Sequence, residues 1–331
     1  MRLYEQSGII GQGNPSTVGS RSITYLRLSI TDRCEMQCLY CKPRGFTTSQ
    51  TTSALSIHEI TNLVRAFANC GVTKVRLTGG EPLTRADVIE IVGAVANTPR
   101  IDTFGLTTNG TGLAELAPDL ARAGLQRINI SLDSLNRDTF RRITGRDMLN
   151  NILNGIDVAL SCGFRRIKLN TVIMRGINDS EIPAFAELAR KMPAEVRFIE
   201  LMPLGHSRDL WQELHIPASE IRSMLGDLSS LPHEPGSSAR LYSLPGGGTV
   251  GIISPISEAF CSECGRIRVT CTGIIKPCLR LPVEEDLRPL LNEPDLTERL
   301  GRMLVGLARH KLTAASKDDT VETDAMCMVG G

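Results

Sequence analysis

The chain has 331 residues, a formal net charge of +1 and only 4% aromatic residues. This length predicts about two domains, and the balanced charge with few aromatic rings excludes a protein that binds nucleic acid through a broad basic surface. Segment 1–21 has no apolar run of signal-peptide length, and no uninterrupted apolar stretch is long enough to span a membrane. We therefore expect a cytoplasmic protein that binds neither nucleic acid nor membrane.

The first 21 residues are rich in Gly, Ser and other polar residues and show no periodicity, which predicts a flexible N-terminal extension over 1–21. After it, a predicted strand in which apolar and polar residues alternate runs directly into Cys34, Cys38 and Cys41. A C-x3-C-x2-C spacing lets a short loop hold three irons of a four-iron cube, which leaves one iron open for a small molecule. A three-cysteine zinc site or three unrelated thiols are the alternatives, although zinc sites favour paired C-x2-C motifs.

An aromatic residue, Tyr40, stands just before the last of these cysteines. With it, the pattern resembles the radical S-adenosylmethionine (SAM) superfamily. The resemblance implies that a 4Fe-4S cluster binds SAM at its open iron and splits it to a 5'-deoxyadenosyl radical, so that the cofactor carries the chemistry and the protein positions it.

Short apolar runs then alternate with amphipathic segments. Strands are expected near 24–30, 73–78, 103–107, 127–132, 166–173 and 195–201. Helices are expected near 56–68, 86–96, 112–123, 149–161 and 180–191. The first helix opens with a capping box, Ser56 and Glu59. Repeated strand-helix units predict an α/β fold with a parallel sheet, here an incomplete (βα)6 barrel over 22–225, the architecture that the resemblance also implies.

Distinctive polar motifs follow several of the expected strands. They are Gly79-Gly80-Glu81-Pro82, Thr107-Thr108-Asn109-Gly110, Ser131-Leu132-Asp133 and Glu200-Leu201-Met202-Pro203. In parallel barrels, the loops after the strands build the active site. Each motif alone consists of residues that are common in turns and loops. Their shared position after the strands, however, predicts one site at this end of the barrel.

The regular alternation fades after about residue 205 into a region rich in Pro, Gly and Ser, so we expect a domain boundary near 225 and a C-terminal domain over 226–331. This region carries a second triad, Cys261, Cys264 and Cys278. Between its cysteines, period-two alternation places Arg266 and Arg268 on one strand face, where two guanidiniums suit a polyanion or a polar base edge. A zinc ribbon with Cys271 as fourth ligand is the alternative, although in a regular strand Cys271 faces away from the arginines.

The two triads, the enclosed Arg266-Ile267-Arg268 and the Gly330-Gly331 terminus together look like the GTP 3',8-cyclase family of molybdenum cofactor biosynthesis, with similarity from Tyr25 to Gly331. The resemblance implies a radical SAM lyase that converts GTP to (8S)-3',8-cyclo-7,8-dihydroguanosine 5'-triphosphate. It also implies two 4Fe-4S clusters, one bound by Cys34, Cys38 and Cys41 with SAM and one bound by Cys261, Cys264 and Cys278 facing GTP.

The resemblance assigns further residues position by position. SAM would be lined by Tyr40, Gly80, Ser131 and Met202. GTP would be bound by Arg27, Arg76, Thr107, Lys168, Arg266, Ile267 and Arg268, with Lys74 and Arg197 as weaker candidates for the triphosphate. Arg27, Arg266 and Arg268 are the expected catalytic residues, and the glycine tail would thread into the cavity between the clusters. Two residues depart from the family pattern, Glu35 after the first cysteine and Cys271 within the second motif.

The expected partners are GTP, SAM, a low-potential electron donor of flavodoxin or ferredoxin type, a cyclic pyranopterin monophosphate synthase that takes over the product, and a second copy in a possible homodimer.

Two rival functions are also compatible with the sequence. One is another radical SAM enzyme with an auxiliary cluster, such as a peptide or cofactor maturase. The other is a non-catalytic iron-sulfur or zinc protein. Cys70, Cys162 and Cys327 stand apart from both triads and are expected to fill the core.

Overall fold

The computed structural model describes residues 17–18, 21–42 and 53–314. Most of the expected N-terminal extension, the Gly330-Gly331 tail and Cys327 lie outside the described residues. At the start of the described chain, β1 (Thr17–Val18) pairs antiparallel with β2 (Arg21–Ser22).

All the expected barrel strands form, each within one residue of its predicted ends. They are β3 (Tyr25–Ser29), β4 (Lys74–Thr78), β5 (Thr103–Thr108), β6 (Arg127–Ser131), β7 (Arg166–Ile173) and β8 (Glu195–Glu200). Each pairs in parallel with the next in chain order. The predicted parallel sheet is therefore confirmed.

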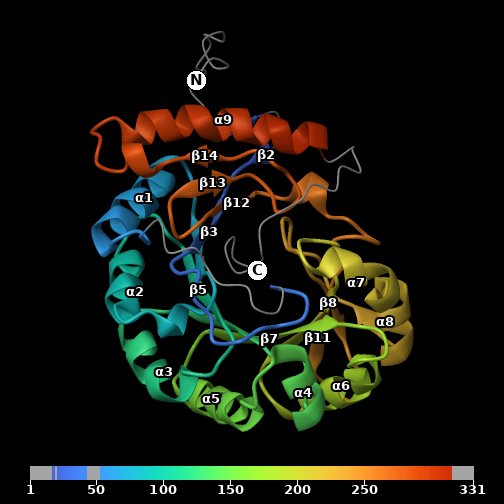
Figure 1. The fold of residues 1–331 in the computed structure, drawn as a ribbon. Helices are drawn as coiled ribbons and strands as arrows, with labels where there is room; N and C mark the ends of the chain where they lie inside the picture. The colour runs from blue at the N-terminus through green and yellow to red at the C-terminus, as the bar shows by residue number, and fades with distance from the viewer. Residues whose placement is uncertain (1–16, 19–20, 43–52, 315–331) are drawn as a thin grey trace.

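The expected helices also form, within two residues of their predicted ends. They are α1 (Ile57–Asn69), α2 (Val88–Ala96), α3 (Leu113–Arg122), α5 (Leu149–Ser161) and α6 (Ile182–Lys191). Their buried residues recur at helical spacing, as in α1, where Ile60, Leu63, Val64 and Phe67 are buried. The helices pack these faces on the outside of the strands (Figure 1). No helix among the described residues is both long and apolar enough to cross a membrane.

Four further helices were not predicted. They are α4 (Arg137–Thr144), α7 (Ser207–Leu214), α8 (Ala218–Leu225) and α9 (Leu296–Ala314). The ends of α4 carry ordinary sequence signals, because Asn136 caps its N-terminus and Gly145 ends it in the left-handed conformation with φ 70°. Those signals could have found it.

The C-terminal region adds strands to both sides of the barrel sheet. Its strands are β9 (Ser229–Ser230), β10 (Arg240–Ser243), β11 (Thr249–Ile253), β12 (Arg266–Val269), β13 (Ile274–Lys276) and β14 (Glu285–Asp286). β11 pairs in parallel with β8, and β12 pairs in parallel with β3. β3 to β14 thus form one sheet in the order β14-β13-β12-β3-β4-β5-β6-β7-β8-β11-β10-β9, separate from the β1-β2 pair. Helix α9 lies across the β12 to β14 side (Figure 1).

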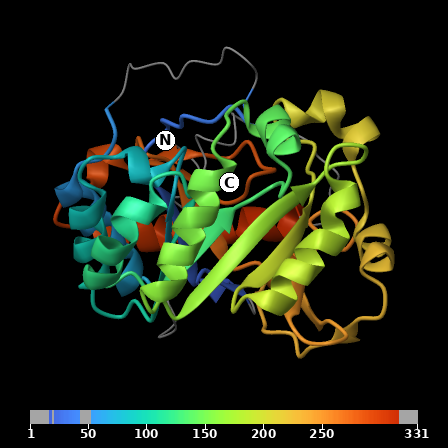
Figure 2. The same cartoon turned by 90° about the horizontal axis from the view of Figure 1, so that it is seen from below.

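The sheet is curved and helices cover its outer face (Figure 1), and the view from below shows its strands running at a tilt (Figure 2). Four short 3-10 helices connect the elements: η1 (Pro82–Thr84), η2 (Asp179–Glu181), η3 (Cys261–Glu263) and η4 (Arg288–Leu290). The largest buried side chains, including Phe67, Phe104, Phe140 and Phe185, are apolar and belong to the main hydrophobic core.

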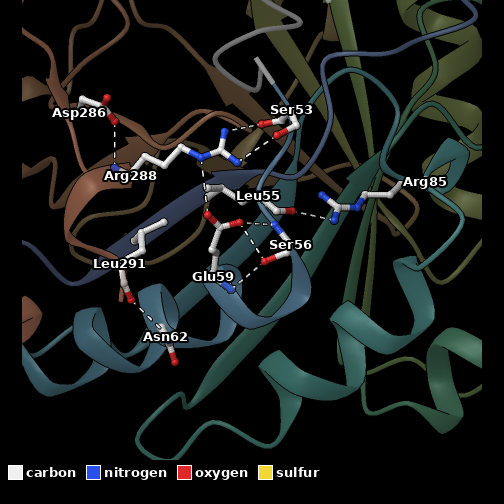
Figure 3. Close-up of polar contacts among 9 residues, drawn as sticks. All are labelled: Ser53, Leu55, Ser56, Glu59, Asn62, Arg85, Asp286, Arg288 and Leu291. Carbon is white, nitrogen blue, oxygen red and sulfur yellow. Dashed lines mark hydrogen bonds and ion pairs between the residues drawn. The ribbon is translucent and has the colours of Figure 1, made fainter. Parts of the chain in front are cut away.

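The segment that leads into α1 is fixed by two arginines and a helix cap (Figure 3). Arg288 donates to the backbone oxygen of Ser53 at 2.6 Å, and Arg85 donates to that of Leu55 at 2.8 Å. The predicted capping box is confirmed, since the Glu59 amide donates to Ser56 Oγ at 3.2 Å and the Ser56 amide donates to Glu59 Oε2 at 2.8 Å. These contacts join α1 to both the β4 loop and the C-terminal region.

Candidate active site

A cavity of about 430 Å³ lies inside the curved sheet and is lined by residues of both cysteine triads. It is lined by residues at the carboxyl ends of the strands, such as Ser131 and Met202. It is also lined by the first residues of β4, β6 and β7, which are Lys74, Arg127 and Arg166. The cavity therefore runs along the barrel from one end of the strands to the other, whereas the interior of a complete eight-stranded barrel is usually packed with side chains.

The first triad follows β3, and its segment is held close to the loop after β4. The Gly80 amide donates to the Thr31 oxygen at 2.7 Å, and the Glu81 amide donates to the Arg33 oxygen at 2.7 Å. A Cβ on Gly79 or Gly80 would collide with these same backbone segments, and Gly79 has φ +146°. The glycine pair is therefore required where the two loops touch.

The carboxylate of Glu81 organises the loop that faces the first triad. It accepts from Thr108 Oγ1 at 2.6 Å, from the Asn109 amide at 2.6 Å and from the Leu83 amide at 2.9 Å. Burial raises the pKa of Glu81 to about 7, although these hydrogen bonds oppose the shift. Glu81 thus ties the β4 and β5 loops together.

Tyr40, next to Cys41, is held by a second buried acid. Its hydroxyl donates to Asp133 Oδ2 at 2.6 Å, and the other oxygen of Asp133 accepts from the Val172 amide at 2.8 Å. Burial raises the pKa of Asp133 to about 6, and burial together with Asp133 raises the pKa of Tyr40 well above its usual value. The cysteine segment is thereby fixed to the ends of β6 and β7.

Glu35, one of the two departures from the family pattern, points toward the β5 loop. Its Oε1 accepts from Asn109 Nδ2 at 2.9 Å and from Thr111 Oγ1. Its Oε2 is buried and has no hydrogen-bond partner among the described residues. A third carboxylate therefore lies beside the first triad.

The second triad lies on η3 and the segment after β13. The Cys264 amide donates to the Cys261 oxygen at 3.3 Å, and the Arg280 amide lies 3.5 Å from Cys278 Sγ. Lys311 Nζ lies 3.6 Å from Cys264 Sγ. Burial raises the pKa of Cys264, but Lys311 and Arg266 outweigh it, so the pKa falls below its usual value.

At the first triad, the effect of burial on the thiol pKa values is not outweighed. There burial raises the pKa of Cys34 to about 11 and the pKa of Cys38 well above its usual value, with nearby carboxylates adding to both shifts. Lys42 opposes these shifts, but its Nζ donates to the Cys34 backbone oxygen at 3.0 Å rather than to a thiol. Burial also raises the pKa of Cys261 in the second triad, so Cys264, beside Lys311 and Arg266, is the thiol whose surroundings favour the thiolate.

The geometry of the triads bears on the zinc alternatives. Within 17–18, 21–42 and 53–314, no three His, Cys, Asp or Glu side chains converge as ligands of a single metal ion. Each triad brings three cysteine thiols to the cavity, which is the donor set of a four-iron cluster that keeps one iron open.

Cys271 does not line the cavity. Its backbone oxygen accepts from the Leu55 amide at 2.8 Å, its side chain is 4% exposed, and burial raises the pKa of its thiol to about 11. The strand alternation places it on the face opposite Arg266 and Arg268, both of which line the cavity.

One register row of the sheet concentrates the arginines. Successive parallel pairings put Arg268, Arg27, Arg76, Gly105, Arg127 and Arg166 side by side across six strands. We call these five arginines the arginine row, and all five line the cavity. A Cβ on Gly105 would lie 3.1 Å from Arg76 Nη1, so the glycine leaves room for this guanidinium.

Lys168 and Arg197 lie next to the arginine row and share one acid. Lys168 Nζ is 3.6 Å from Glu195 Oε1, and Arg197 Nε donates to the same carboxylate. Burial and the charge of Arg197 lower the pKa of Lys168 to about 7, against the pull of Glu195. The protein thus holds more cationic groups here than carboxylates to balance them.

Several polar atoms in this wall have no partner among the described residues. They are Thr107 Oγ1, Arg127 Nε, Asn129 Oδ1 and Asn170 Oδ1, all buried atoms of residues that line the cavity. Buried polar groups are nearly always hydrogen-bonded. These atoms therefore fit a polar ligand inside the cavity, and the surrounding cations fit an anionic one.

The structure brings together nearly all the residues that the sequence pointed to. Lining the cavity are Arg27, Tyr40, Arg76, Gly80, Thr107, Ser131, Lys168, Met202, Arg266, Arg268 and both cysteine triads, together with Lys74 and Arg197. Ile267 is expected to contribute its main chain rather than its side chain, which is 0% exposed and faces the core. The sequence reasoning missed Arg127, Arg166, Glu234 and Lys311, of which the first three line the cavity.

Comparisons with known proteins agree with this site. The chain matches the family models of the Radical SAM superfamily over residues 28–189 and of Molybdenum Cofactor Synthesis C over residues 194–316. A GTP 3',8-cyclase of Clostridium acetobutylicum is 43% identical over 282 residues, which cover 85% of this chain and 89% of that relative. This chain belongs to the GTP 3',8-cyclase family. A GTP 3',8-cyclase of Desulforamulus reducens is 40% identical and is covered over 98% of its length, with 94% of this chain.

Solved structures support the fold. Streptococcus suis SuiB bound to S-adenosylmethionine superposes with a TM-score of 0.62 at 12% identity, over 93% of this chain and 78% of that one. The same protein bound to precursor peptide SuiA gives a TM-score of 0.56 at 12% identity, over 93% of this chain and 76% of that one. The predicted radical SAM fold and GTP 3',8-cyclase family are thus confirmed, and with the family its cofactors, SAM and two 4Fe-4S clusters.

Proposed function

We propose that this chain is a GTP 3',8-cyclase that converts GTP to (8S)-3',8-cyclo-7,8-dihydroguanosine 5'-triphosphate in the first step of molybdenum cofactor biosynthesis. The observation that carries the proposal is one cavity bordered by both cysteine triads and by the arginine row. A polyanionic nucleotide placed between two clusters needs such an arrangement. Family membership supports the same reaction.

At the carboxyl ends of the strands, Cys34, Cys38 and Cys41 would hold the first cluster. When bound, this cluster and SAM supply the 5'-deoxyadenosyl radical that takes the 3' hydrogen from the GTP ribose. Tyr40, Gly80, Ser131 and Met202 would line SAM. The bonds of Glu81 and Asp133 support this assignment, because they fix the loops that carry these residues before any ligand binds.

The arginine row, with Lys74 and Lys168, would bind the triphosphate. Guanidinium groups match phosphate oxygens with two parallel hydrogen bonds, and charge-assisted bonds of this kind are stronger than neutral ones. Burial is costly for charged groups, and it lowers the pKa of Arg27 to about 10 and that of Arg268 to about 9. A bound triphosphate would stabilise the charged form of both guanidiniums.

Cys261, Cys264 and Cys278 would hold the second cluster, close to Arg266 and Arg268. Arg266 Nη1 lies 4.0 Å from Cys264 Sγ, and its guanidinium also lies over the rings of Phe260 and Tyr25. This end would position the guanine base, with the main chain of Ile267 within reach. Orienting C8 toward the ribose is the step that these residues would contribute.

We further propose a cytoplasmic location, a low-potential electron donor of flavodoxin or ferredoxin type, hand-off of the product to a cyclic pyranopterin monophosphate synthase, and a possible homodimer. The domain division near residue 225 and the threading of the Gly330-Gly331 tail into the cavity also stay predictions.

The decisive experiment is anaerobic incubation of the reconstituted chain with SAM, dithionite and GTP, followed by mass spectrometry. We expect both 5'-deoxyadenosine and cyclised GTP, with about eight irons per chain for two four-iron clusters. Cys34→Ala should abolish both products, whereas Cys162→Ala, a thiol outside the cavity, should retain them. Deoxyadenosine without any GTP product would instead indicate a different radical SAM enzyme.

A further inference from the structure

A buried lysine from the C-terminal helix reaches the second cysteine triad. Lys311 lies in the last turn of α9 and is only 6% exposed. Its Nζ lies 3.6 Å from Cys264 Sγ and also donates to the backbone oxygen of Arg266. Helix α9 therefore places a positively charged group next to the sulfur of one candidate cluster ligand.

The charges around Lys311 indicate what balances it. Burial lowers the pKa of Lys311, while the thiols of Cys264 and Cys278 oppose the shift by favouring its charged form. Arg266, the other strongly charged neighbour, disfavours that form. A buried ammonium is costly unless an anion compensates it, and the thiolates of a cluster provide that anion.

At the first triad, the side chain that approaches a thiol is neutral, since Asn109 Nδ2 lies 3.9 Å from Cys34 Sγ. The buried lysine near this triad, Lys42, donates to a backbone oxygen, and the nearby charges include Glu35, Glu81 and Asp133. Hydrogen bonds to ligand sulfur and the net charge near a cluster are two of the factors that set its reduction potential. The two sites therefore differ in the very factors that a protein uses to tune a cluster.

We infer that Lys311 is a positioning residue that raises the reduction potential of the second cluster, because its charge and its N–H donor on Cys264 favour the reduced, more negative state. The inference rests on the proposed assignment of Cys261, Cys264 and Cys278 as cluster ligands. Through the Arg266 backbone oxygen, the same ammonium also fixes the strand that carries the proposed guanine-binding residues.

The test is a potentiometric titration of the full chain followed by electron paramagnetic resonance. To isolate the second cluster, Cys34, Cys38 and Cys41 are replaced by Ala in every sample. Lys311→Met should lower the midpoint potential by about 59 mV or more, which is a tenfold change in the equilibrium constant of a one-electron couple. Lys311→Arg, which keeps the charge and a donor, should stay close to the parent value.

Arg309→Met is the matched control. It removes one positive charge from the same helix two residues away, but Arg309 is exposed, so solvent should screen its effect on the cluster. The midpoint potential should therefore stay unchanged. A shift as large as that of Lys311→Met would show that the net charge of the helix matters rather than the contact with Cys264, and would overturn the inference.

The remaining outcomes separate the inference from the proposed function. If the parent with the three alanines binds no cluster, the ligand assignment fails and the inference fails with it. If the parent is loaded and Lys311→Met leaves the potential unchanged, only the inference is overturned. Should Lys311→Met alone fail to load, Lys311→Gln decides, since an amide keeps a donor without the charge: a lowered potential supports the role of the charge, and an unchanged one refutes it.

Discussion

The two ends of the cavity differ in the sign of their charge. At the carboxyl ends of β3 to β6, the cysteines lie among Glu35, Glu81 and Asp133, which backbone amides and hydroxyls hold in place. At the other end, the arginine row and Lys168 outnumber the acids that face them. Carboxylates disfavour adding an electron to a nearby cluster, whereas cations favour it. The chain thus separates a site lined by carboxyl groups from a site lined by cations.

The largest expected effect concerns the cationic end alone. Arg268→Ala should lower GTP conversion by about a hundredfold or more, because it removes charge-assisted hydrogen bonds in a desolvated site. Uncoupled cleavage of SAM should continue, because the carboxylate end is untouched. Quantifying deoxyadenosine and cyclised GTP in the same reaction separates the two. Arg165→Ala, an exposed arginine just before β7, is the control, and equal losses in both variants would contradict the role of the row.

A smaller effect is expected for Arg127, which lies beside Arg166 in the arginine row. Arg127→Met should raise KM for GTP about tenfold through the loss of one charged hydrogen bond, with a smaller change in kcat. If Arg127 contacts phosphate, the preference for GTP over GMP should shrink as well. Steady-state kinetics with both nucleotides measure this, beside Arg122→Met at an exposed position. An unchanged nucleotide preference would remove Arg127 from the triphosphate site.

The pH dependence of GTP binding sharpens the same comparison. The pKa of Lys168 is about 7, so this group loses its charge as pH rises above that value in the empty site. A bound triphosphate favours the charged form, so binding takes up a proton at Lys168, and this group alone should lower the affinity by up to about tenfold per pH unit from pH 7.5 to 8.5. Calorimetry in buffers of different ionisation enthalpy detects the proton.

Tyr25 is the second group to consider in that pH range. Arg76 and Arg27 lower the pKa of Tyr25 to about 7 against the effect of burial, and a bound triphosphate would raise it again. Lys168→Met and Tyr25→Phe should each remove part of the dependence. If both variants keep the full slope, neither group is the proton acceptor.

The smallest effect on the enzyme is expected from a substitution that lies outside both ends of the cavity. Ser56→Ala removes the N-cap of α1 and should lower the free energy of unfolding by about 1 kcal/mol. Turnover of GTP should stay unchanged. Urea denaturation measures the difference, with Ser223→Ala at an exposed position of α8 as the reference. A loss of turnover without a loss of stability would mean that the start of α1 takes part in the site.

The barrel and both triads could be predicted from sequence because their signals are local. Period-two runs, the capping box at Ser56 and the spacing of Cys34, Cys38 and Cys41 are each contained in a few residues. The alternation of Arg266 and Arg268 also predicted the face that these residues share, and β12 confirms it.

The arginine row could not be predicted in the same way. It exists because β12 pairs with β3 in a register that sets Arg268 beside Arg27, and because β6 and β7 set Arg127 beside Arg166. Such registers depend on which strands become neighbours, which no local pattern specifies. The approach of Lys311 to Cys264 likewise depends on how α9 packs, since the two residues are far apart in the sequence.

The pairing of β12 with β3 has a consequence for biosynthesis. While the chain emerges from the ribosome, β3 is synthesised long before β12. Until β12 is made, the backbone amides and carbonyls along one edge of β3 have no strand to hydrogen-bond with. Exposed strand edges of this kind invite association between nascent chains. The last strands to be synthesised therefore protect the first, and a chain that stops before Arg266 should aggregate rather than yield a smaller working barrel.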